Sequence, residues 1–259
     1  MLKAWNANKL GHGLAKAGLD TRALRRALAA SEDALTSSVF GRVSYLPAAV
    51  QLRVWDAAAP LGGPATSLGA RLPDAPPAWE FWPNYAPAKG DRGLRVEPDV
   101  VVRYGAHWLV VEAKHHGHQY AGQWRRELRA IRAAEEIPEG HLHFIAVGGN
   151  APEWDAALAA EVVATPGLGD VALYRLTWSA LHVRLAELRQ GGGARGPDAP
   201  RDATGGPLDH GHHAMLADAC EALAGAGHSH RPDVWTLPAA HARIGPSPFS
   251  IRSLPCPTR

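Results

Sequence analysis

The sequence predicts a mixed α/β fold in which helices cover both faces of a central mixed β-sheet. Short apolar runs with strand character alternate along the chain with longer segments whose apolar residues recur at helical spacing. Two neighbouring runs, 99–104 and 107–112, carry apolar side chains at both odd and even positions. A strand that is apolar on both faces is normally covered on both sides. With 259 residues and 46% hydrophobic composition, the chain is large enough to bury such a core in one domain.

The first part of the chain is expected to hold one long helix and two strands. Residues 20–46 predict the helix, because they form one apolar stripe: Leu24, Leu28, Leu35, Val39, Val43 and Leu46. It would begin at the N-cap candidates Asp20 and Thr21 and end before Pro47. Residues 51–56 alternate as a half-buried strand does, 57–77 predict a loop, and 79–82 predict a short aromatic strand.

The second part alternates helices and strands. Helices are expected at 119–136, 154–164, 178–189 and 208–224, and strands at 142–147 and 171–176. Residues 190–207 are rich in Gly, Pro and Ala and contain no large apolar residue, which predicts a flexible linker or a disordered insertion. We therefore divide the chain into a core domain (1–189), this linker, and a C-terminal helix with an irregular tail (208–259) that packs on the core.

Composition excludes several classes of protein. The 27 basic and 25 acidic residues give a net charge of +2, so any basic surface for nucleic acid must be local. Two cysteines provide no disulfide framework, which favours a reducing cytoplasm. The N-terminus lacks the apolar core of a signal peptide, and no apolar run approaches the roughly 20 residues of a membrane span. A soluble, cytoplasmic protein is expected.

The runs 99–104 and 107–112 are separated only by Gly105 and Ala106, which predicts a tight hairpin. Opposed residues then have positions that sum to 211, so Asp99 lies across from Glu112 with Cβ atoms roughly 5 Å apart. Lys114 projects from the same face, two residues beyond Glu112. The hairpin thus brings two carboxylates and an ammonium together.

Such a group is typical of a divalent-cation site with a catalytic lysine beside it. Mg²⁺ takes oxygen ligands, usually one or two carboxylates with waters and a substrate phosphate. Asp99 and Glu112 would supply the carboxylates, and the backbone carbonyl of Ala113 could complete the set. Lys114 would orient an attacking water or offset charge on a phosphate. The alternative is an exposed ion pair of little energetic value between Glu112 and Lys114, with Asp99 as a turn residue after Pro98.

Glu32 is a second acidic candidate. At 100° per residue it falls about 80° from Leu24, inside the apolar stripe of the first helix, whereas Asp33 falls at about 180°. An acidic residue on a buried helix face is costly unless a partner satisfies it, and a metal site would do so. A salt bridge in the core, or a position at the edge of the stripe, is the alternative.

The helix expected at 119–136 adds polar and basic candidates. Gln119, Gln123 and Glu127 form a row beside its apolar stripe, and such amides could reach the site or a phosphodiester backbone. The rest of its surface carries four arginines: Arg125, Arg126, Arg129 and Arg132. These would track phosphates of a nucleic acid. A solvated helix face is the simpler interpretation of the arginines.

The chain has 14 histidines, several of them clustered. The clusters are His115, His116 and His118, and His210, His212 and His213. Their spacing matches no structural zinc pattern and no cysteine accompanies them, so surface positions in polar loops are expected. His115 and His116 could still touch a substrate, because they follow Lys114 directly.

Taken together, these residues resemble the PD-(D/E)xK nuclease superfamily. The resemblance is carried by Glu32, Pro98-Asp99, Glu112-Ala113-Lys114 and Gln123. It covers roughly residues 20–180, and the order of elements agrees with the restriction-endonuclease-like αβββαβ core, here with a C-terminal helical extension. The segments SEDALTSSVFGRVSYLP, EFWP, VEPDVVV, VVEAK and QWRREL also resemble a bacterial branch associated with defence or mobile-element loci.

The resemblance implies Mg²⁺-dependent (or Mn²⁺-dependent) hydrolysis of phosphodiester bonds. Asp99 and Glu112 would be metal ligands, Lys114 would activate water, and Glu32 would be an auxiliary ligand. Gln123 would be a further catalytic residue, and Arg125, Arg126, Arg129, His115 and His116 would contact nucleic acid. The expected substrate is DNA.

The expected role is that of an effector in a multi-component anti-phage or anti-plasmid system, with protein partners for targeting or activation. Whether the chain forms a homo-oligomer is left open. Two alternatives remain: a catalytically silent module of the same fold that binds DNA or a partner, and a His-rich metal-binding protein.

Overall fold

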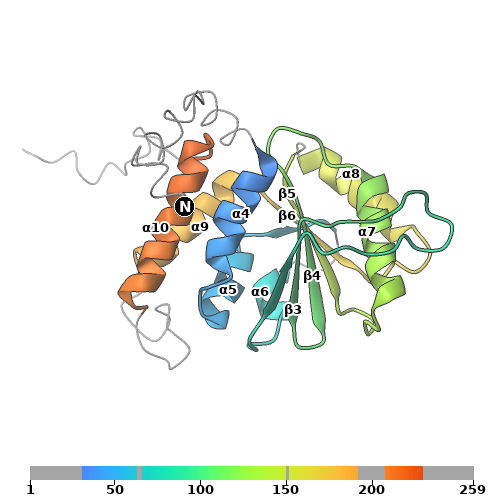
Figure 1. The fold of residues 1–259 in the computed structure, drawn as a ribbon, viewed down its shortest axis with the longest axis horizontal. Coiled ribbons are helices and arrows are strands. Elements are labelled where there is room, and N and C mark those ends of the chain that lie inside the picture. The colour runs from blue at the N-terminus through green and yellow to red at the C-terminus, as the bar shows by residue number, and fades with distance from the viewer. Residues whose placement is uncertain (1–30, 63–65, 150–151, 192–207, 230–259) are drawn as a thin grey trace, which may run out of the picture.

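The computed structural model describes residues 31–62, 66–149, 152–191 and 208–229 (Figure 1). These residues form a mixed α/β fold with one six-stranded sheet in the order β1-β6-β5-β4-β3-β2. The strands are β1 (Ala59–Pro60), β2 (Ala78–Phe81), β3 (Val100–Tyr104), β4 (His107–Lys114), β5 (Leu142–Gly148) and β6 (Ala172–Leu176). The predicted class, a mixed sheet flanked by helices, is confirmed.

The directions of the strands place the carboxyl ends of two neighbouring strands side by side. β4, β5 and β6 are mutually parallel. β2 pairs with β3, and β3 pairs with β4, in both cases antiparallel. The β3–β4 hairpin has the predicted register, running from Val100 opposite Val111 to Tyr104 opposite His107. The carboxyl ends of β4 and β5, Lys114 and Gly148, are aligned. Both strands therefore finish at the same edge.

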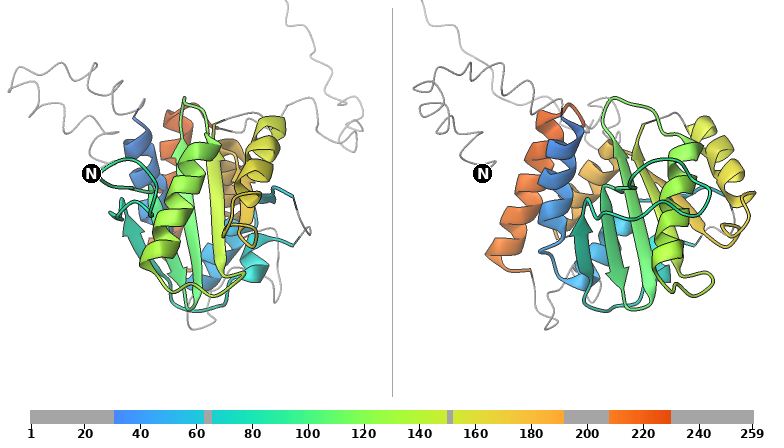
Figure 2. Two further views of the ribbon diagram at one scale, coloured as in Figure 1. Left: turned by 90° about the vertical axis from the view of Figure 1, so that its right-hand side faces the viewer. Right: turned by 45° about the vertical axis from the view of Figure 1, so that its right-hand side comes forward.

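Helices cover the two faces unequally. α4 (Glu32–Val43), α5 (Ala48–Trp55), α6 (Leu68–Arg71), α9 (Trp178–Arg189) and α10 (His210–Gly225) supply residues to one core cluster. α7 (Ala121–Ala134) and α8 (Pro152–Val163) supply residues to a second. Figures 1 and 2 show α4, α9 and α10 on one side of the sheet and α7 and α8 on the other. The expectation of burial on both faces is confirmed.

Two predictions about the first part of the chain need correction. The predicted helix 20–46 is described only from residue 31; α4 begins after the N-cap Ser31, whose hydroxyl accepts from the Ala34 N–H at 3.2 Å, and ends at Val43. Residues 51–56 are not a strand but the larger part of α5. The buried residues Val50, Gln51, Val54 and Trp55 follow helical spacing, which outweighs the local alternation. The predicted loop 57–77 also contains β1 and α6.

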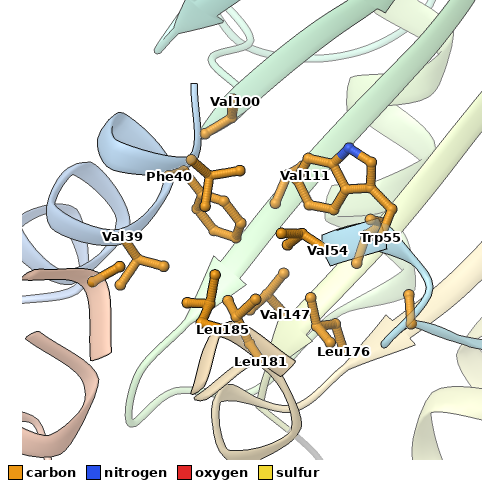
Figure 3. Packing of buried hydrophobic residues seen from close by; sticks show 14 of the residues in the cluster. Val39, Phe40, Val54, Trp55, Val100, Val111, Val147, Leu176, Leu181 and Leu185 are labelled. Atoms are coloured by element: carbon orange, nitrogen blue, oxygen red, sulfur yellow. The ribbon is translucent and has the colours of Figure 1, made fainter. Parts of the chain in front are cut away.

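The larger core cluster joins the helical layer to the hairpin. In Figure 3, the side chain of Phe40 of α4 lies between Val39 of the same helix and Val111 of β4, with Leu181 and Leu185 of α9 next to them. All of these side chains are fully buried. This packing fixes α4 against β4, so that the first turn of α4 lies beside the end of that strand.

The C-terminal helix α10 packs on the core, as expected. Leu216, Ala219 and Leu223 of α10 belong to the same buried cluster as α4 and α9. Residues 192–207, which are most of the linker predicted at 190–207, and residues 230–259 of the predicted tail lie outside the described residues. Within the described part of the chain, no helix has the length and apolar character needed to cross a membrane.

Candidate active site

Asp99 and Glu112 are the two acidic groups of the hairpin, and both are buried. Val100 of β3 is paired with Val111 of β4. Asp99 directly precedes Val100, and Glu112 directly follows Val111. They are 8% and 1% exposed. Oδ2 of Asp99 accepts a hydrogen bond from the Ala113 backbone N–H at 2.7 Å, which ties the start of β3 to the end of β4.

The buried environment disfavours the simultaneous ionisation of Asp99 and Glu112. Burial, and then the charge of Glu112, raise the pKa of Asp99 to about 7, against the opposing effects of the Ala113 N–H and Lys114. Burial also raises the pKa of Glu112, although Lys114 counteracts it. A bound cation would relieve this repulsion, because it favours the ionised form of both groups.

Lys114 lies at the end of β4 between two carboxylates. Its ammonium pairs with Glu112 and lies 3.1 Å from Oε1 of Glu32. Burial acts to lower the pKa of Lys114, but the two carboxylates outweigh it and hold that pKa above its usual value. The backbone carbonyl of Lys114 accepts from Nε1 of Trp178 at 3.0 Å. Side chain and backbone are thus both held.

Glu32 is the first residue of α4 and joins that helix to the hairpin. Oε1 contacts Lys114, and Oε2 accepts from the backbone N–H of His115 at 2.9 Å. The Glu32 side chain is 31% exposed, and protein donors engage both of its oxygens, which corresponds to the salt-bridge alternative and not to a metal ligand.

Gln119 and Gln123, which belong to the polar row expected at 119–127, both contact Glu112. Nε2 of Gln123 donates to Oε1 of Glu112 at 2.6 Å. Gln119, just before α7, donates from Nε2 to the carbonyl oxygens of Glu112 at 3.2 Å and Val147 at 3.3 Å. Trp124 in turn donates to Oε1 of Gln119 at 2.8 Å. Gln123 is therefore in contact with the acidic pair, while Gln119 braces the backbone of β4 and β5.

Sequence reasoning placed Glu127 in this row but gave it no role in the site. In the structure it is 2% exposed, and burial, followed by the charge of Glu112, raises its pKa well above the usual value. In the sequence, the spacing of four residues between Gln123 and Glu127 indicates that both lie on the same face of the helix. What the sequence could not show is how closely α7 packs against β4.

The arginines of α7 point to other parts of the protein. Arg125 pairs with Glu161 of α8 at 3.4 Å, and Arg129 pairs with Asp91 at 2.8 Å. Arg132 pairs with Asp170 at 2.6 Å, whereas Arg126 is exposed. Three of the four expected phosphate contacts are thus engaged within the chain, and Arg126 is presented to solvent.

The histidines after Lys114 differ from one another. His116 and His118 are exposed, as expected for a polar loop, but His115 is only 8% exposed, so its predicted surface position is wrong. Its ring stacks on that of His116 with centroids 3.7 Å apart and meets His228, which follows α10, at 5.0 Å. Burial of His115 follows from this contact with the C-terminal segment, which no local pattern reveals.

The donor atoms fit a hard divalent cation better than a transition metal. Among the described residues, no group of three or more His, Cys, Asp or Glu side chains is arranged to hold a metal ion. Asp99 and Glu112 nevertheless offer two buried carboxylates in mutual repulsion, which match the one or two carboxylates that Mg²⁺ usually takes from a protein. Lys114 supplies positive charge beside Glu112.

Comparison of the chain with models of known protein families, with curated proteins and with solved structures gave no match. The arrangement of the side chains around Glu112 is therefore the basis for assigning a function.

Proposed function

We propose that the protein is a metal-dependent nuclease of the PD-(D/E)xK type that hydrolyses phosphodiester bonds in DNA. One observation carries the proposal. Asp99, Glu112 and Lys114 meet at the end of the β3–β4 hairpin, and each is held there by a hydrogen bond or ion pair. Held groups of this kind bind and orient a reacting phosphate more effectively than mobile ones.

The order of elements supports the same assignment. The helix carrying Glu32 is followed, after α5, β1 and α6, by three antiparallel strands, β2, β3 and β4, then by α7 and the parallel strand β5. This order agrees with the αβββαβ core of restriction-endonuclease-like proteins. The hairpin places the acidic pair at the edge where β4 and β5 end, and α7 begins beyond that edge.

Each side chain has a separate role in the proposed reaction. Asp99 and Glu112 would hold Mg²⁺ or Mn²⁺ through their carboxylates, and the Ala113 carbonyl could supply a further oxygen. When bound, the ion would polarise the scissile phosphate and offset its negative charge. Lys114 orients the attacking water and stabilises charge that develops on the phosphate.

Glu32 and Gln123 hold Lys114 and Glu112 in place through hydrogen bonds. Because protein donors engage both Glu32 oxygens, we assign Glu32 to holding Lys114 rather than to the auxiliary ligand role that the resemblance implies. Gln123 fixes Oε1 of Glu112. His116 and Arg126 are exposed and are assigned to contacts with the DNA backbone.

Target choice is assigned to a protein partner. The described residues form one sheet with its covering helices and include no second domain for recognition. The resemblance to defence-associated chains supports an effector in a multi-component bacterial system against phages or plasmids.

A catalytically silent module of the same fold is the alternative. A silent module has no need for Lys114 between two carboxylates or for an amide on Glu112, and both are present. The lack of a three-residue metal cluster among the described residues makes the His-rich metal-binding alternative weaker still.

The test is cleavage of plasmid and single-stranded DNA with Mg²⁺ or Mn²⁺, with and without EDTA. We expect wild-type cleavage that needs the metal, and its loss in Asp99→Ala and Lys114→Ala, with both variants still folded by circular dichroism. Asp74→Ala is the matched control, since Asp74 is exposed next to Pro73, which lies near Gly105 at the turn of the hairpin. Wild-type activity in either site variant would refute the assignment.

A further inference from the structure

Four aromatic rings form a row beside Lys114. From the core outwards they belong to Trp178, His228, His115 and His116, and the centroids of successive rings lie 6.1, 5.0 and 3.7 Å apart. Trp178 is 2% exposed and His115 is 8% exposed, whereas His116 is exposed. The row therefore runs from the buried core to the surface.

Hydrogen bonds hold the inner rings in place. Nε1 of Trp178 donates to the carbonyl oxygen of Lys114 at 3.0 Å. Nε2 of His115 donates to the carbonyl oxygen of Ala226, the residue that caps α10, at 3.3 Å. The exposed ring of His116 thus stacks on a ring that is itself fixed.

The end of α10 brings His228 into the row. Gly227 has φ of +87°, the left-handed conformation in which helices commonly end, and the N–H of His228 returns to the Leu223 carbonyl at 2.9 Å. In Figure 1, α10 runs beside α4, and the end of α10 is level with the start of α4. The C-terminal helix therefore contributes a ring at the edge of the sheet where the proposed site lies.

His116 offers a flat surface next to the proposed catalytic group. It is two residues from Lys114, and His115 covers one face of its ring. Proteins that bind single strands stack nucleobases on aromatic rings presented in this way. Inside a duplex both faces of each base are already covered by the neighbouring bases. Only an unpaired base has a free face for His116.

Other exposed rings belong to segments that begin at the same edge. Tyr120, directly before α7, is 59% exposed, and Trp154, in the first turn of α8, is 66% exposed. These helices follow β4 and β5, whose carboxyl ends are aligned. Further bases of an unpaired strand can stack on such rings, whereas a duplex leaves them uncovered.

We propose that His116 stacks on an unpaired base next to the scissile phosphate, so that the substrate is DNA that is single-stranded where it is cut. This inference rests on the proposed function, and it moves His116 from the DNA backbone to a base. A contact with phosphate needs a polar or charged group, but stacking needs only a ring. Substitution can therefore separate the two.

Three variants of His116 make this separation. His116→Phe keeps a ring without nitrogen atoms, His116→Lys keeps a charge without a ring, and His116→Ala removes both. His210→Ala is the control, because His210 is exposed at the start of α10, roughly 24 Å along the helix from its end. The readouts are the affinity for a fluorescent single-stranded oligonucleotide, in EDTA and in Ca²⁺, and the rate of its cleavage with Mn²⁺, alone and in a duplex.

We expect the single strand to be cut roughly 10-fold faster than the duplex or more, since a paired base must first leave its stack. His116→Phe and His210→Ala should bind the single strand as wild type does. His116→Ala and His116→Lys should bind it roughly 5- to 100-fold more weakly, in line with the loss of stacking on one base. Equal rates on the two DNAs, or full affinity in His116→Lys with a loss in His116→Phe, would overturn the proposal.

An oligonucleotide with one abasic nucleotide tests the contact from the side of the DNA. Moved along the strand, the abasic position should weaken binding to wild type at one place and have no further effect there on His116→Ala. Losses that multiply at every position would show that His116 touches no base. Coupled losses without any metal-dependent cleavage would keep the stacking contact and reject the proposed function. Metal-dependent cleavage without coupling would do the reverse.

Discussion

Oε1 of Glu32 lies 3.1 Å from Nζ of Lys114, although 82 residues separate them in the sequence. The contact joins the first turn of α4 to the last residue of β4. The second oxygen of Glu32 is bonded to the His115 N–H. The helix therefore holds both the side chain of Lys114 and the backbone that follows it.

Glu32→Gln should lower the rate of DNA cleavage while leaving cation affinity nearly unchanged. The amide keeps the shape and one acceptor but loses the charge that fixes Lys114. Since small displacements of a catalytic group are costly, we expect kcat to fall roughly 10- to 100-fold. Kinetics and Mn²⁺ calorimetry on the same preparation measure the two effects separately.

Glu80→Gln provides the control for this prediction. Glu80 also pairs with a cation, Arg103 at 2.8 Å, but both side chains are 42% exposed. Such a pair contributes about 1 kcal/mol at most, so the variant should behave as wild type. If Glu32→Gln lost as much Mn²⁺ affinity as Glu112→Gln, Glu32 would be a metal ligand after all.

Gly148→Ala should disturb the site through the backbone. Gly148 has φ of +65°, and an added Cβ would overlap the Lys114 carbonyl oxygen and lie 2.7 Å from Nε1 of Trp178. Left-handed strain and overpacking together should cost roughly 3 kcal/mol or more in the free energy of unfolding. Urea unfolding measures this loss, and cleavage should fall because Lys114 must move.

Gly167→Ala is the matched control, since Gly167 has φ of +80° but nothing within 4 Å of an added Cβ. It carries the conformational strain alone, so a cost of about 1 kcal/mol and normal cleavage are expected. Equal losses for the two alanines would show that the contact with Lys114 and Trp178 is unimportant.

The site was predictable to the extent that it depends on one hairpin. A two-residue turn fixes the register, and the register fixes where Asp99 and Glu112 lie. The local alternation of residues 51–56 predicts a strand, but these residues belong to α5, and the buried Gln51 of that helix is satisfied in part by distant partners. Oε1 of Gln51 accepts from Tyr104 at 2.9 Å and from Trp79 at 3.0 Å. Bonds across about 30 to 50 positions leave no local pattern, and the same holds for the burial of His115 by the C-terminal segment.

Arg175→Leu should strongly destabilise the fold. Nε of Arg175 on β6 lies 2.6 Å from Oδ2 of Asp155, whose side chain is fully buried in the first turns of α8. Removing the cation leaves a buried carboxylate without this ion pair, which typically costs about 3–5 kcal/mol. Urea unfolding at pH 7 measures the loss.

The double variant Asp155→Leu, Arg175→Leu should recover much of that stability, because no buried charge remains. Arg95→Leu is the control, since its pair with Glu97 is at 3.4 Å with Arg95 62% exposed, and it should change stability by about 1 kcal/mol or less. A loss for Arg175→Leu as small as that control would contradict the prediction.

A histidine cluster at the opposite end of β4 should make stability fall in weak acid. Nε2 of His143 lies 3.0 Å from Nδ1 of His107, and the rings of His107 and His141 are 4.2 Å apart. Burial, followed by the charges of His107, Arg71 and His141, lowers the pKa of His143 to about 3. The unfolded chain takes up this proton near pH 6.5, whereas the folded chain does not.

The sign of the effect follows from that difference. Between about pH 6.5 and 3 His143 is protonated in the unfolded state but not in the folded state, so the contribution of this residue to the free energy of unfolding decreases as the pH falls. The contribution of His143 is complete above pH 6.5 and should drop by about 2 kcal/mol between pH 7 and pH 5, or roughly 4–8 °C in the unfolding midpoint. His143→Gln has no such proton to take up. Its midpoint should fall less over this interval than that of wild type, whatever its stability at pH 7, and parallel midpoints for the two chains would show that His143 is not the group responsible.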